Sequence, residues 1–556
     1  MHTKIVSRAL LLASLVVAWT SVAPVQTPIG SIGVSPARAA DVAVTRITGG
    51  TDRYGVAAAI SRAHFAPGVP AVFVATGQNF PDALAGGPIA ARMGVPILLV
   101  RSGDIPAPTA DELRRLAPNR IIILGGTASV SGTVAANLGA YQTGGGVQRI
   151  SAADRYGLAA AVSQAYVPAG VAVVYVATGE NFPDALSGGV GAGRAGTSIL
   201  LVRGGGIPSS TATELRRLRP GRIVVLGGPG SVSDGVVSAL RAYATSGQVT
   251  RIGGRDRYDV AVGVSRSAYP NGAAALYVAN GQNYPDALTA VPAAARAGAS
   301  LLLVPSDRLP TAVRDEARRL LPTRLAIVGG PVSVRDRVTF DLRVALGDLP
   351  PLPACRYTDV LTKFRAYGDW HRTLLDTIYM IGRDYHPGDM VDTSSAGLNG
   401  GYPVRSHIAA DLKALAAAAR AAGRPIQVAS GFRSWDQQKA TFDYWVSVGG
   451  YEQALRTSAR AGHSEHQLGT TLDFTTQGGL PPWEYADWAT TPAGAWMAAN
   501  AHKYGFVMSY PKGRFSTVCY DYEPWHYRYL GRDRARAVVQ SGLTLREWLW
   551  MVGDGA

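Results

Sequence analysis

Two histidines, an aspartate and a glutamate near the C-terminal end of this 556-residue chain have the types and spacing of a hydrolytic metal site. His466 and Asp473 lie seven residues apart, and His526 follows fifty residues later. Two imidazoles and one carboxylate can hold a catalytic zinc ion while leaving a fourth position for water. Glu523, three residues before His526, could act on that water as general base. These residues predict a zinc-dependent hydrolase.

A neighbouring histidine, His463, is a rival ligand. We favour His466 because Gly469 permits a turn after it, from which residues 471–474 can run as a strand that directs Asp473 back to the metal. Seven of the nine histidines follow residue 347, so any imidazole chemistry belongs to the C-terminal part of the chain.

Arg433 lies in the segment 430–438, whose pattern is typical of a strand end that enters a helix. Its guanidinium could donate to a carbonyl oxygen on which negative charge develops during hydrolysis. The alternative interpretation is a surface arginine at a helix start.

The chain has two cysteines, Cys355 and Cys519. In an oxidising compartment a single disulfide between them is the simplest interpretation. It would join the start of the last domain to the region just before Glu523. The alternative, zinc ligation by a cysteine, is not needed because a ligand set is already complete.

The middle of the chain contains three copies of one unit. The triplet Asp-Arg-Tyr at residues 52–54 returns at 154–156 and 256–258, a spacing of 102 each time. Two further features keep the same register, and these are Asn-(Phe/Tyr)-Pro-Asp-Ala-Leu at 79–84, 181–186 and 283–288, and Gly-Gly at 125–126, 227–228 and 329–330. Three features in constant register establish the repeat.

Each unit alternates short apolar runs with helical patterns. In the first unit residues 71–74, 97–100 and 121–124 are continuous apolar runs, typical of parallel strands covered on both faces. Helical patterns begin at Asp52 and near residues 111–116. The fold class predicted is three α/β units with parallel βαβ-type sheets, followed by an α+β domain. The Gly-Gly pairs lack the spacing of a nucleotide-binding loop, so we interpret them as structural turns.

The basic charge of the chain belongs to the repeats. Residues 41–347 contain 30 Arg, no Lys and 19 acidic residues, a net charge of +11, out of +15 for the whole chain. In an exported protein such a field favours an anionic wall polymer as partner rather than nucleic acid. The alternative is that arginine serves solubility and codon bias.

The Asp-Arg-Tyr triplets admit two interpretations. Each could supply an ion pair and a core aromatic, or its arginine could face a ligand, which makes Arg53, Arg155 and Arg257 candidates for polymer binding. Four other arginine sets keep the same register, and these are Arg92/Arg194/Arg296, Arg114/Arg216/Arg318, Arg115/Arg217/Arg319 and Arg120/Arg222/Arg324.

The N-terminus has the pattern of an export signal. Lys4 and Arg8 precede an apolar run over residues 9–19, and the small residues Ala37 and Ala39 offer a cleavage site after residue 39. The alternative is a membrane anchor. No later stretch is long and apolar enough to span a bilayer, so we expect a secreted protein without a transmembrane span.

The tripled unit resembles the type-2 cell-wall-binding repeat of Gram-positive surface proteins over residues 45–346. The resemblance implies a three-lobed module that attaches non-covalently to an anionic secondary wall polymer, and hence a location at the cell wall.

Residues 355–550 resemble the VanY-type D-alanyl-D-alanine carboxypeptidases through four motifs in order. The matched segments are Ser-Gly-Phe-Arg-Ser at 430–434, Gly-His-Ser-Glu-His-Gln-Leu-Gly at 462–469 with Asp473, Tyr-Gly-Phe at 504–506, and Glu-Pro-Trp-His-Tyr-Arg-Tyr at 523–529. One departure is Thr471, where the family commonly has a small alanine; its extra hydroxyl near the metal strand is expected to alter the shape of the pocket.

The resemblance implies Zn²⁺ on His466, Asp473 and His526, with Glu523 as general base and acid and Arg433 stabilising the oxyanion. Gln438 and Ser464 fall where that family contacts the peptide, and Trp525 is a further expected substrate contact. The implied substrates are peptidoglycan stem peptides, from which the enzyme would remove the terminal D-alanine.

Two other functions stay open. One is an L,D-carboxypeptidase or peptidoglycan endopeptidase of the same fold, and the other is a non-catalytic wall-binding surface protein. The domain boundaries expected are a signal peptide at 1–39, repeats at 45–147, 148–249 and 250–346, a stiff linker at 347–354 and the zinc peptidase domain at 355–556.

Overall fold

The computed structural model describes residues 42–50, 52–79, 81–553 and 555. The expected signal peptide lies outside these described residues. Within them, none of the helices combines the length and apolar character needed to cross a bilayer.

Each repeat builds a four-stranded parallel sheet whose outer strand comes from another unit. The strand order in the first sheet is β3 (Ile97–Val100), β2 (Ala71–Thr76), β4 (Arg120–Leu124), β5 (Val147–Ile150). In the second it is β7 (Ile199–Val202), β6 (Val173–Thr178), β8 (Arg222–Leu226), β9 (Gln248–Ile252). In the third it is β11 (Ser300–Val304), β10 (Ala275–Asn280), β12 (Arg324–Val328), β1 (Ala43–Ile47). The strands expected at residues 71–74, 97–100 and 121–124 are confirmed.

The exchange of strands closes the array on itself. Strand β5 belongs to the second repeat but completes the first sheet, and β9 of the third repeat completes the second sheet. Strand β1 of the first repeat returns to pair with β12, with Ala43 opposite Arg324. Every unit is therefore joined to both others through backbone hydrogen bonds.

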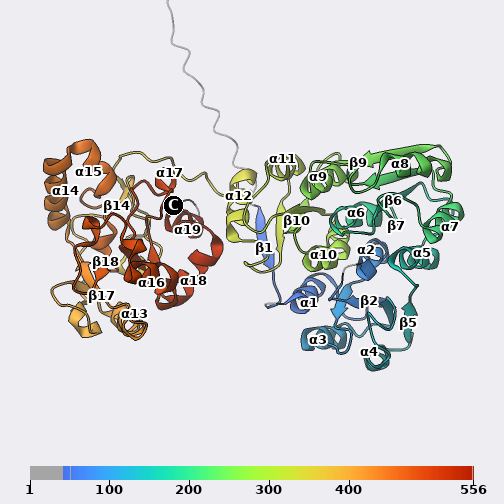
Figure 1. Ribbon diagram of the computed structural model, residues 1–556, viewed down its shortest axis with the longest axis horizontal. Helices are drawn as coiled ribbons and strands as arrows, with labels where there is room; N and C mark the ends of the chain where they lie inside the picture. The colour runs from blue at the N-terminus through green and yellow to red at the C-terminus, as the bar shows by residue number, and fades with distance from the viewer. Residues whose placement is uncertain (1–41, 51, 80, 554, 556) are drawn as a thin grey trace, which may run out of the picture. The chain divides into compact units, whose positions relative to one another are not determined.

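Helices cover the sheets and form the centre of the array. They are α1 (Arg53–His64), α2 (Pro81–Met93), α3 (Ala107–Leu116), α4 (Gly132–Leu138), α5 (Arg155–Tyr166), α6 (Pro183–Arg194), α7 (Ser209–Leu218), α8 (Asp234–Leu240), α9 (Arg257–Ala268), α10 (Pro285–Arg296), α11 (Thr311–Leu320) and α12 (Asp336–Leu346). The equivalent helices α2, α6 and α10 pack against one another, as Figure 1 shows. Small residues such as Gly189 and Gly193 allow this approach, because a Cβ there would meet Val291 or Ala91 within 3 Å.

The Asp-Arg-Tyr triplet has a structural role in each unit. Asp52 is the N-cap of α1 and accepts a hydrogen bond from the Gly55 N–H, while Tyr54 is buried. Arg53 donates to the carbonyl of Gly77. In the first unit a helix cap and a backbone contact therefore take the place of the expected ion pair between described residues. The core aromatic is confirmed for Tyr54 and Tyr156, whereas Tyr258 of the third unit is only partly buried.

One set of arginines in constant register pairs with a fully buried glutamate in each unit. Glu112 accepts hydrogen bonds from Ser61 Oγ and from Arg115 Nη2, both at 2.6 Å. The same arrangement recurs with Glu214 and Glu316. Arg115, Arg217 and Arg319 thus compensate an internal charge, so they are committed to the fold.

The C-terminal domain is built on a four-stranded antiparallel sheet whose strands differ in length. Its order is β17 (Ile426–Ser430), β18 (Thr471–Thr476), β20 (His526–Tyr529), β19 (Phe506–Met508). Two small pairs precede it, β13 (Val360–Leu361) with β14 (Tyr379–Met380) and β15 (Met390–Asp392) with β16 (Pro403–Arg405). The helices are α13 (Ala409–Ala421), α14 (Trp435–Gly449), α15 (Tyr451–Thr457), α16 (Pro492–Asn500), α17 (Phe515–Val518), α18 (Arg532–Ser541) and α19 (Leu545–Val552). An apolar cluster that includes Phe474, Trp488 and Phe506 supports the sheet.

The expected disulfide is present between Cys355 and Cys519. The segment expected to be a linker makes defined contacts: Leu349 is buried, the Pro350 carbonyl accepts from Trp550 Nε1, and Arg546 donates to the Pro353 carbonyl.

Candidate metal centre and active site

The two central strands and one short helix position the three predicted metal ligands. Asp473 on β18 lies directly opposite His526 on β20 in the antiparallel register. His466 lies on a 3₁₀ helix at Glu465–Leu468, which ends at Gly469 in the left-handed conformation, with φ 71°. That turn returns the chain into β18, as predicted, because glycine adopts this conformation without steric cost.

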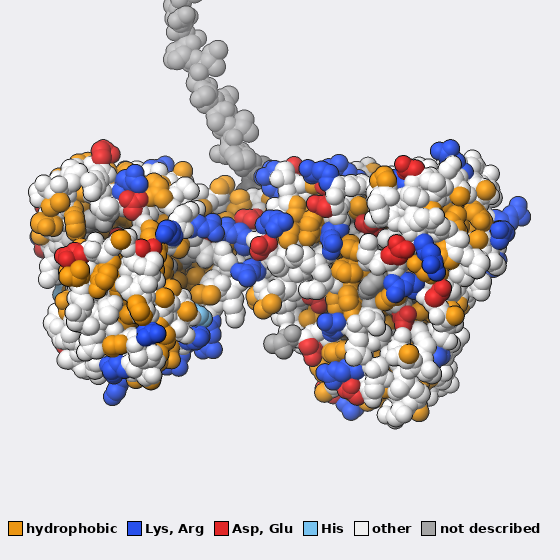
Figure 2. Space-filling view, in the orientation of Figure 1, with side chains coloured by type: hydrophobic (Ala, Val, Ile, Leu, Met, Phe, Trp, Pro, Cys, Tyr) orange, Lys and Arg blue, Asp and Glu red, His pale blue; other side chains and the backbone are white. Residues whose placement is uncertain are grey.

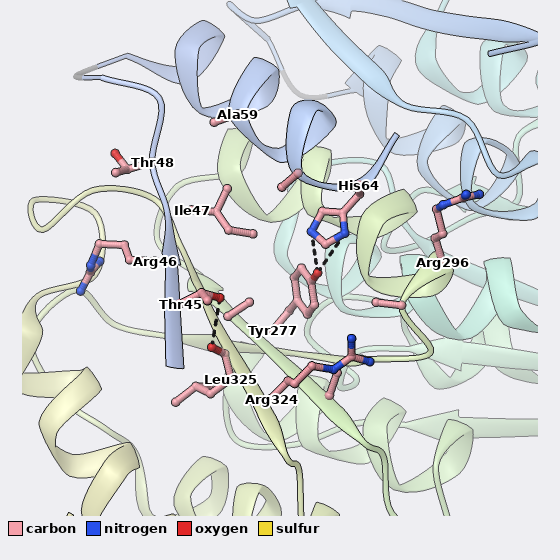
Figure 3. A pocket seen from close by; sticks show the side chains of 14 residues that line it. Thr45, Arg46, Ile47, Thr48, Ala59, His64, Tyr277, Arg296, Arg324 and Leu325 are labelled. Atoms are coloured by element: carbon pink, nitrogen blue, oxygen red, sulfur yellow. Dashed lines mark hydrogen bonds between the residues drawn. The ribbon is translucent and has the colours of Figure 1, made fainter. Parts of the chain in front are cut away.

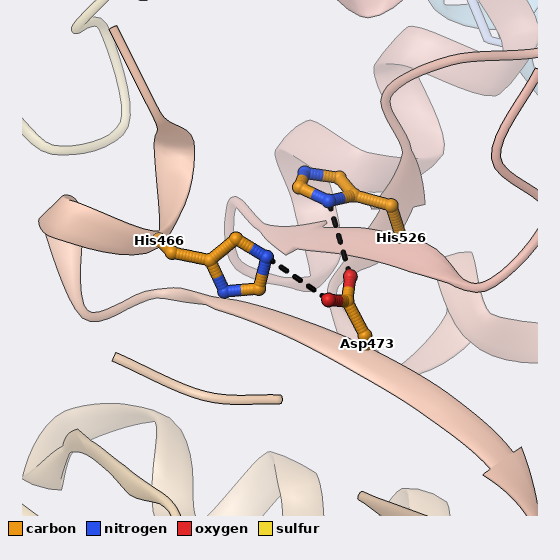
Figure 4. Close-up of side chains that lie close together, drawn as sticks. All are labelled: His466, Asp473 and His526. Atoms are coloured by element: carbon orange, nitrogen blue, oxygen red, sulfur yellow. Dashed lines mark ion pairs between the residues drawn. The ribbon is translucent and has the colours of Figure 1, made fainter. Parts of the chain in front are cut away.

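The three side chains converge on one point (Figure 4). One ligand atom of each residue lies within 4.8 Å of the others, and all three residues are buried. His466 Nε2 lies 3.2 Å from Asp473 Oδ2, and His526 Nδ1 lies 3.1 Å from Asp473 Oδ1.

The donor set fits a zinc ion. Among the described residues, no hydrogen bond satisfies the buried His466 Nε2 or Asp473 Oδ1. Buried polar atoms are rarely left without a partner, and a cation would satisfy both. Two nitrogens and a carboxylate oxygen are ligands typical of catalytic zinc sites.

Hydrogen bonds on the far side of each ring select its tautomer. His466 Nδ1 lies 2.7 Å from the Gly431 carbonyl, which leaves Nε2 as the ligand atom. His526 Nε2 lies 3.1 Å from Glu465 Oε2, which leaves Nδ1 facing Asp473. The rival His463 is occupied elsewhere, because its two nitrogens contact the Asp376 carbonyl and Asp359. The preference for His466 is therefore confirmed by geometry.

Glu465 is a functional residue that the sequence did not single out. Its carboxylate contacts His526, accepts from Arg528 Nη1 at 2.8 Å and accepts from Ser509 Oγ at 2.5 Å. Burial alone would raise the pKa of Glu465, but Arg528 and His526 hold it down at about 2. Its place beside His466 was a weak signal, since only the fold brings it against His526.

In the absence of a metal ion, the pKa values of the three ligand residues are shifted in different directions. Burial and Arg433 lower the pKa of His466 to about 4, although Asp473 opposes them. Burial disfavours a charge on His526 as well, but the carboxylates of Asp473 and Glu465 beside its ring raise its pKa to about 10. The pKa of Asp473 stays well below its usual range because these imidazoles outweigh burial.

Glu523 lies beside the ligands but is not one of them. Its Oε2 is 3.5 Å from His526 Nδ1, and its N–H donates to the Tyr510 carbonyl. Burial raises the pKa of Glu523 to about 8, with Asp473 adding to the effect and His526 opposing it. A carboxyl with a pKa near neutrality can both accept and return a proton.

Arg433 faces the same centre from the end of β17. Its Nη1 lies 3.9 Å from Asp473 Oδ2. Its Nε donates to Gln438 Oε1 at 2.8 Å, and Nη1 also donates to Ser430 Oγ. It is not the exposed arginine of the alternative interpretation, since 24% of its side chain is accessible and its donors are oriented by named partners.

The other predicted site residues have different surroundings. Gln438 is fully buried, and its amide donates to the Ala459 carbonyl, so its polar atoms hold Arg433 in place. Ser464 is buried and accepts from the His466 N–H. Trp525 is partly buried against the core of the domain. Thr471 is fully buried on β18, and its hydroxyl makes no hydrogen bond to the described residues.

The candidate polymer-binding arginines each use part of their guanidinium within the array. Arg155 donates to the Gly179 carbonyl at 2.6 Å and Arg257 to the Gly281 carbonyl at 2.7 Å, as Arg53 does to Gly77. Figure 2 shows arginines at several separate places on the array, with acidic side chains among them.

Comparison with known proteins finds a family model that matches each part of the chain. The family described as VanY, D-alanyl-D-alanine carboxypeptidase, matches residues 402–532. The family described as cell wall binding domain 2 matches residues 46–135, 149–237 and 251–339.

Similar proteins cover one part of the chain or the other. YodJ of Bacillus subtilis (strain 168) is 34% identical over 32% of this chain and 65% of its own length. A D-alanyl-D-alanine carboxypeptidase of Enterococcus faecalis is 29% identical over 36% of this chain and 79% of its own. The structure of Cwp8 from Clostridium difficile is 25% identical, with a TM-score of 0.50, over 55% of this chain and 52% of that one. The chain spans 40% to 65% of the length of the first three curated relatives it matches.

Proposed function

Because the chain carries a VanY D-alanyl-D-alanine carboxypeptidase domain of the zinc type after three cell wall binding domain 2 repeats, we propose that it is an exported enzyme that trims peptidoglycan at the wall. Its substrates are stem peptides, from which it removes the C-terminal D-alanine. The repeats hold it to an anionic secondary wall polymer, at the surface of a Gram-positive-type bacterium.

The observation that carries the catalytic proposal is Glu523 beside the buried ligand set. His466, Asp473 and His526 would hold a zinc ion, which would supply the Lewis acidity that polarises a scissile carbonyl and acidifies a water molecule. Glu523 takes the proton of the attacking water and returns it to the departing amine of D-alanine. Its carboxylate lies 3.5 Å from His526 Nδ1, close enough to the ligand set to serve both transfers.

Arg433 stabilises the charge that develops on the carbonyl oxygen. Gln438 and Ser430 fix the guanidinium before the substrate arrives, so little reorganisation is needed during reaction. Gln438 thereby acts through Arg433. Ser464 and Trp525 remain proposed contacts of the peptide.

Wall attachment would raise the local concentration of substrate for the peptidase domain. The net charge of +11 over residues 41–347 supports an anionic polymer as ligand. Tethering turns encounter with the stem peptide into a nearly intramolecular event. Export through the segment 1–39 belongs to the same proposal.

The test uses the purified zinc-loaded protein on soluble stem peptides of different length. We expect free D-alanine from a pentapeptide ending in D-alanyl-D-alanine. Glu523→Gln should lower that rate by about 10²- to 10⁴-fold, the usual contribution of a general base, while the variant still binds one zinc per chain.

Other outcomes identify the other functions. Release of D-alanine from the tetrapeptide alone indicates an L,D-carboxypeptidase, and cleavage inside the stem indicates an endopeptidase. If neither wild-type protein nor variant cleaves any stem peptide, the catalytic proposal is wrong and a wall-binding surface protein remains.

A further inference from the structure

A pocket of 610 Å³ lies where the third unit meets the first, at the closure of the array (Figure 3). One wall is helix α1, which contributes Ala59, Ala63 and His64. The other is the third sheet, with residues of β1, β10 and β12. We call this space the closure pocket.

The closure pocket lies where the chain has smaller side chains than at the junction of the first and second units. Ala326 on β12 occupies the register position of Ile122 on β4 and Val224 on β8. His64 occupies the position of Tyr166, whose ring packs against Phe73 at 5.8 Å between the first and second units. The first junction is therefore filled by apolar atoms that the closure pocket lacks.

The lining of the closure pocket is basic and contains no acidic residue. It includes Arg46, Arg296 and Arg324. Arg46 is neutralised by Asp336 at 2.6 Å. Neither Arg296 nor Arg324 forms an ion pair with a carboxylate of the described residues; Arg296 lies over the Phe65 ring. Two uncompensated guanidiniums thus border one cavity.

Polar groups inside the cavity complete the lining. Tyr277 Oη lies 2.7 Å from His64 Nε2, and Figure 3 shows this pair in the middle of the pocket with Arg324 below it. Burial and the charges of Arg296 and Arg324 lower the pKa of His64, so both guanidiniums act on this imidazole. An anion would relieve that repulsion and could accept from Tyr277 and from either arginine.

We propose that the closure pocket binds an anionic group of the wall polymer, a phosphate or a carboxylate. This inference rests on the proposed wall binding and gives it a location. The array has three junctions of similar sequence, and the closure junction differs from the first by its cavity and by its His64–Tyr277 pair. The polymer is therefore held more strongly at the closure junction than at the first.

The test measures affinity of the full chain for defined polymers by calorimetry. The probes are a poly(glycerol phosphate), a polygalacturonate and neutral dextran. The variant R296Q/R324Q removes both charges, and its matched control R92Q/R120Q removes the equivalent charges at the first junction. A third variant, Ala326→Ile, fills the cavity with the side chain that the first unit has, without changing charge.

We expect R296Q/R324Q to weaken binding of the preferred anionic polymer by about tenfold or more, as loss of two charge-assisted contacts implies. Ala326→Ile should weaken binding to a similar extent, because its larger side chain occupies the space of the bound group. R92Q/R120Q should change it by less than about twofold, since the Tyr166 ring packs against Phe73 at the first junction and fills the corresponding space. All variants should keep the wild-type melting temperature and peptidase activity on a soluble stem peptide. The polymer that is bound shows whether the group is phosphate or carboxylate.

Equal losses of affinity in the two double variants, or unchanged binding by Ala326→Ile, would overturn the proposal that the closure pocket binds the polymer. Either result would leave the proposed wall binding intact. Absence of binding by the wild-type chain to isolated walls and to both anionic polymers would overturn the wall-binding function itself, and this site with it.

Discussion

At the residue scale, the metal centre depends on partners that the ligands use away from the metal. The Gly431 carbonyl holds His466 and the Glu465 carboxylate holds His526, each through the nitrogen that does not face Asp473. Arg528 is fully buried and binds Glu465 as well as the carbonyls of Trp370 and Thr373. The orientation of His526 is thus linked to residues 370–373, which precede the segment 402–532 that the family model matches.

Glu465→Gln should weaken zinc binding by about 10- to 100-fold, the usual effect of losing a partner of a ligating histidine. The amide lacks the negative charge that the Glu465 carboxylate presents to the imidazole N–H, and its NH₂ group could face the ring instead. Chelator competition measures the zinc Kd, with Glu484→Gln as control because Glu484 is exposed. Equal affinities for wild type and Glu465→Gln would show that Glu465 does not support the ligand.

Zinc binding should release protons at neutral pH. Without metal the pKa of His526 is raised to about 10, so its imidazole is protonated at pH 7 and must lose that proton to become a ligand. His466, with a pKa of about 4, is already neutral. Calorimetry in buffers of different ionisation enthalpy should report at least one proton released per zinc; a value near zero would contradict a protonated His526.

At the element scale, the Gly-Gly turns that follow β4, β8 and β12 let a carboxyl group from a neighbouring helix approach the backbone closely. Gly227 follows β8 with φ 100°, and a Cβ there would lie 2.3 Å from Asp184 Oδ2. Gly125 and Gly329 have the same relation to Asp82 and Asp286. The repeated motif is therefore a structural turn that receives a helix-borne carboxyl, as the missing nucleotide-binding pattern indicated.

Gly227→Ala should destabilise the array by about 1–3 kcal/mol, because it combines a left-handed backbone with a steric clash. Gly230→Ala is the matched control, since no atom lies within 4 Å of a Cβ at that position and its φ is not positive. Denaturant unfolding of both variants measures the difference. Similar stabilities would mean that the turn relaxes without cost.

At the scale of the whole molecule, closure of the array brings residues nearly three hundred positions apart into contact. Arg46 donates to the carbonyls of Gly329 and Val334 and forms an ion pair with Asp336. Arg149 and Arg251 make the equivalent contacts with Gly125 and Gly227 at the other two junctions. The first strand therefore closes the ring by the same contacts that join successive units.

Arg46→Ala should lower the free energy of unfolding by about 1.5–3 kcal/mol, the range for hydrogen bonds to a charged group. Arg308→Ala, at an exposed position whose ion pair is with the adjacent Asp307, should be nearly neutral. Thermal and denaturant unfolding measure both. If Arg46→Ala were as stable as Arg308→Ala, the contact would contribute nothing to closure.

The sequence alone determined the features that are local or repeated. Three copies in constant register specified three similar α/β units, and the apolar runs predicted their strands because both faces of a parallel sheet are covered. His466, Asp473, His526 and Glu523 could be selected since their types and spacing already restrict the chemistry. The seven-residue spacing between His466 and Asp473, with Gly469 between them, is enough for the chain to turn and bring Asp473 back to the metal.

Tertiary structure decided what depends on distant partners. The strand exchange through β1, the contact of Glu465 with His526 and the cavity beside His64 each join segments from 61 to 283 residues apart. No periodicity encodes such pairs, because packing of complete elements selects them. For the same reason only the fold could show that Arg115 neutralises a buried carboxylate while Arg324, in an equally regular register, borders an open cavity.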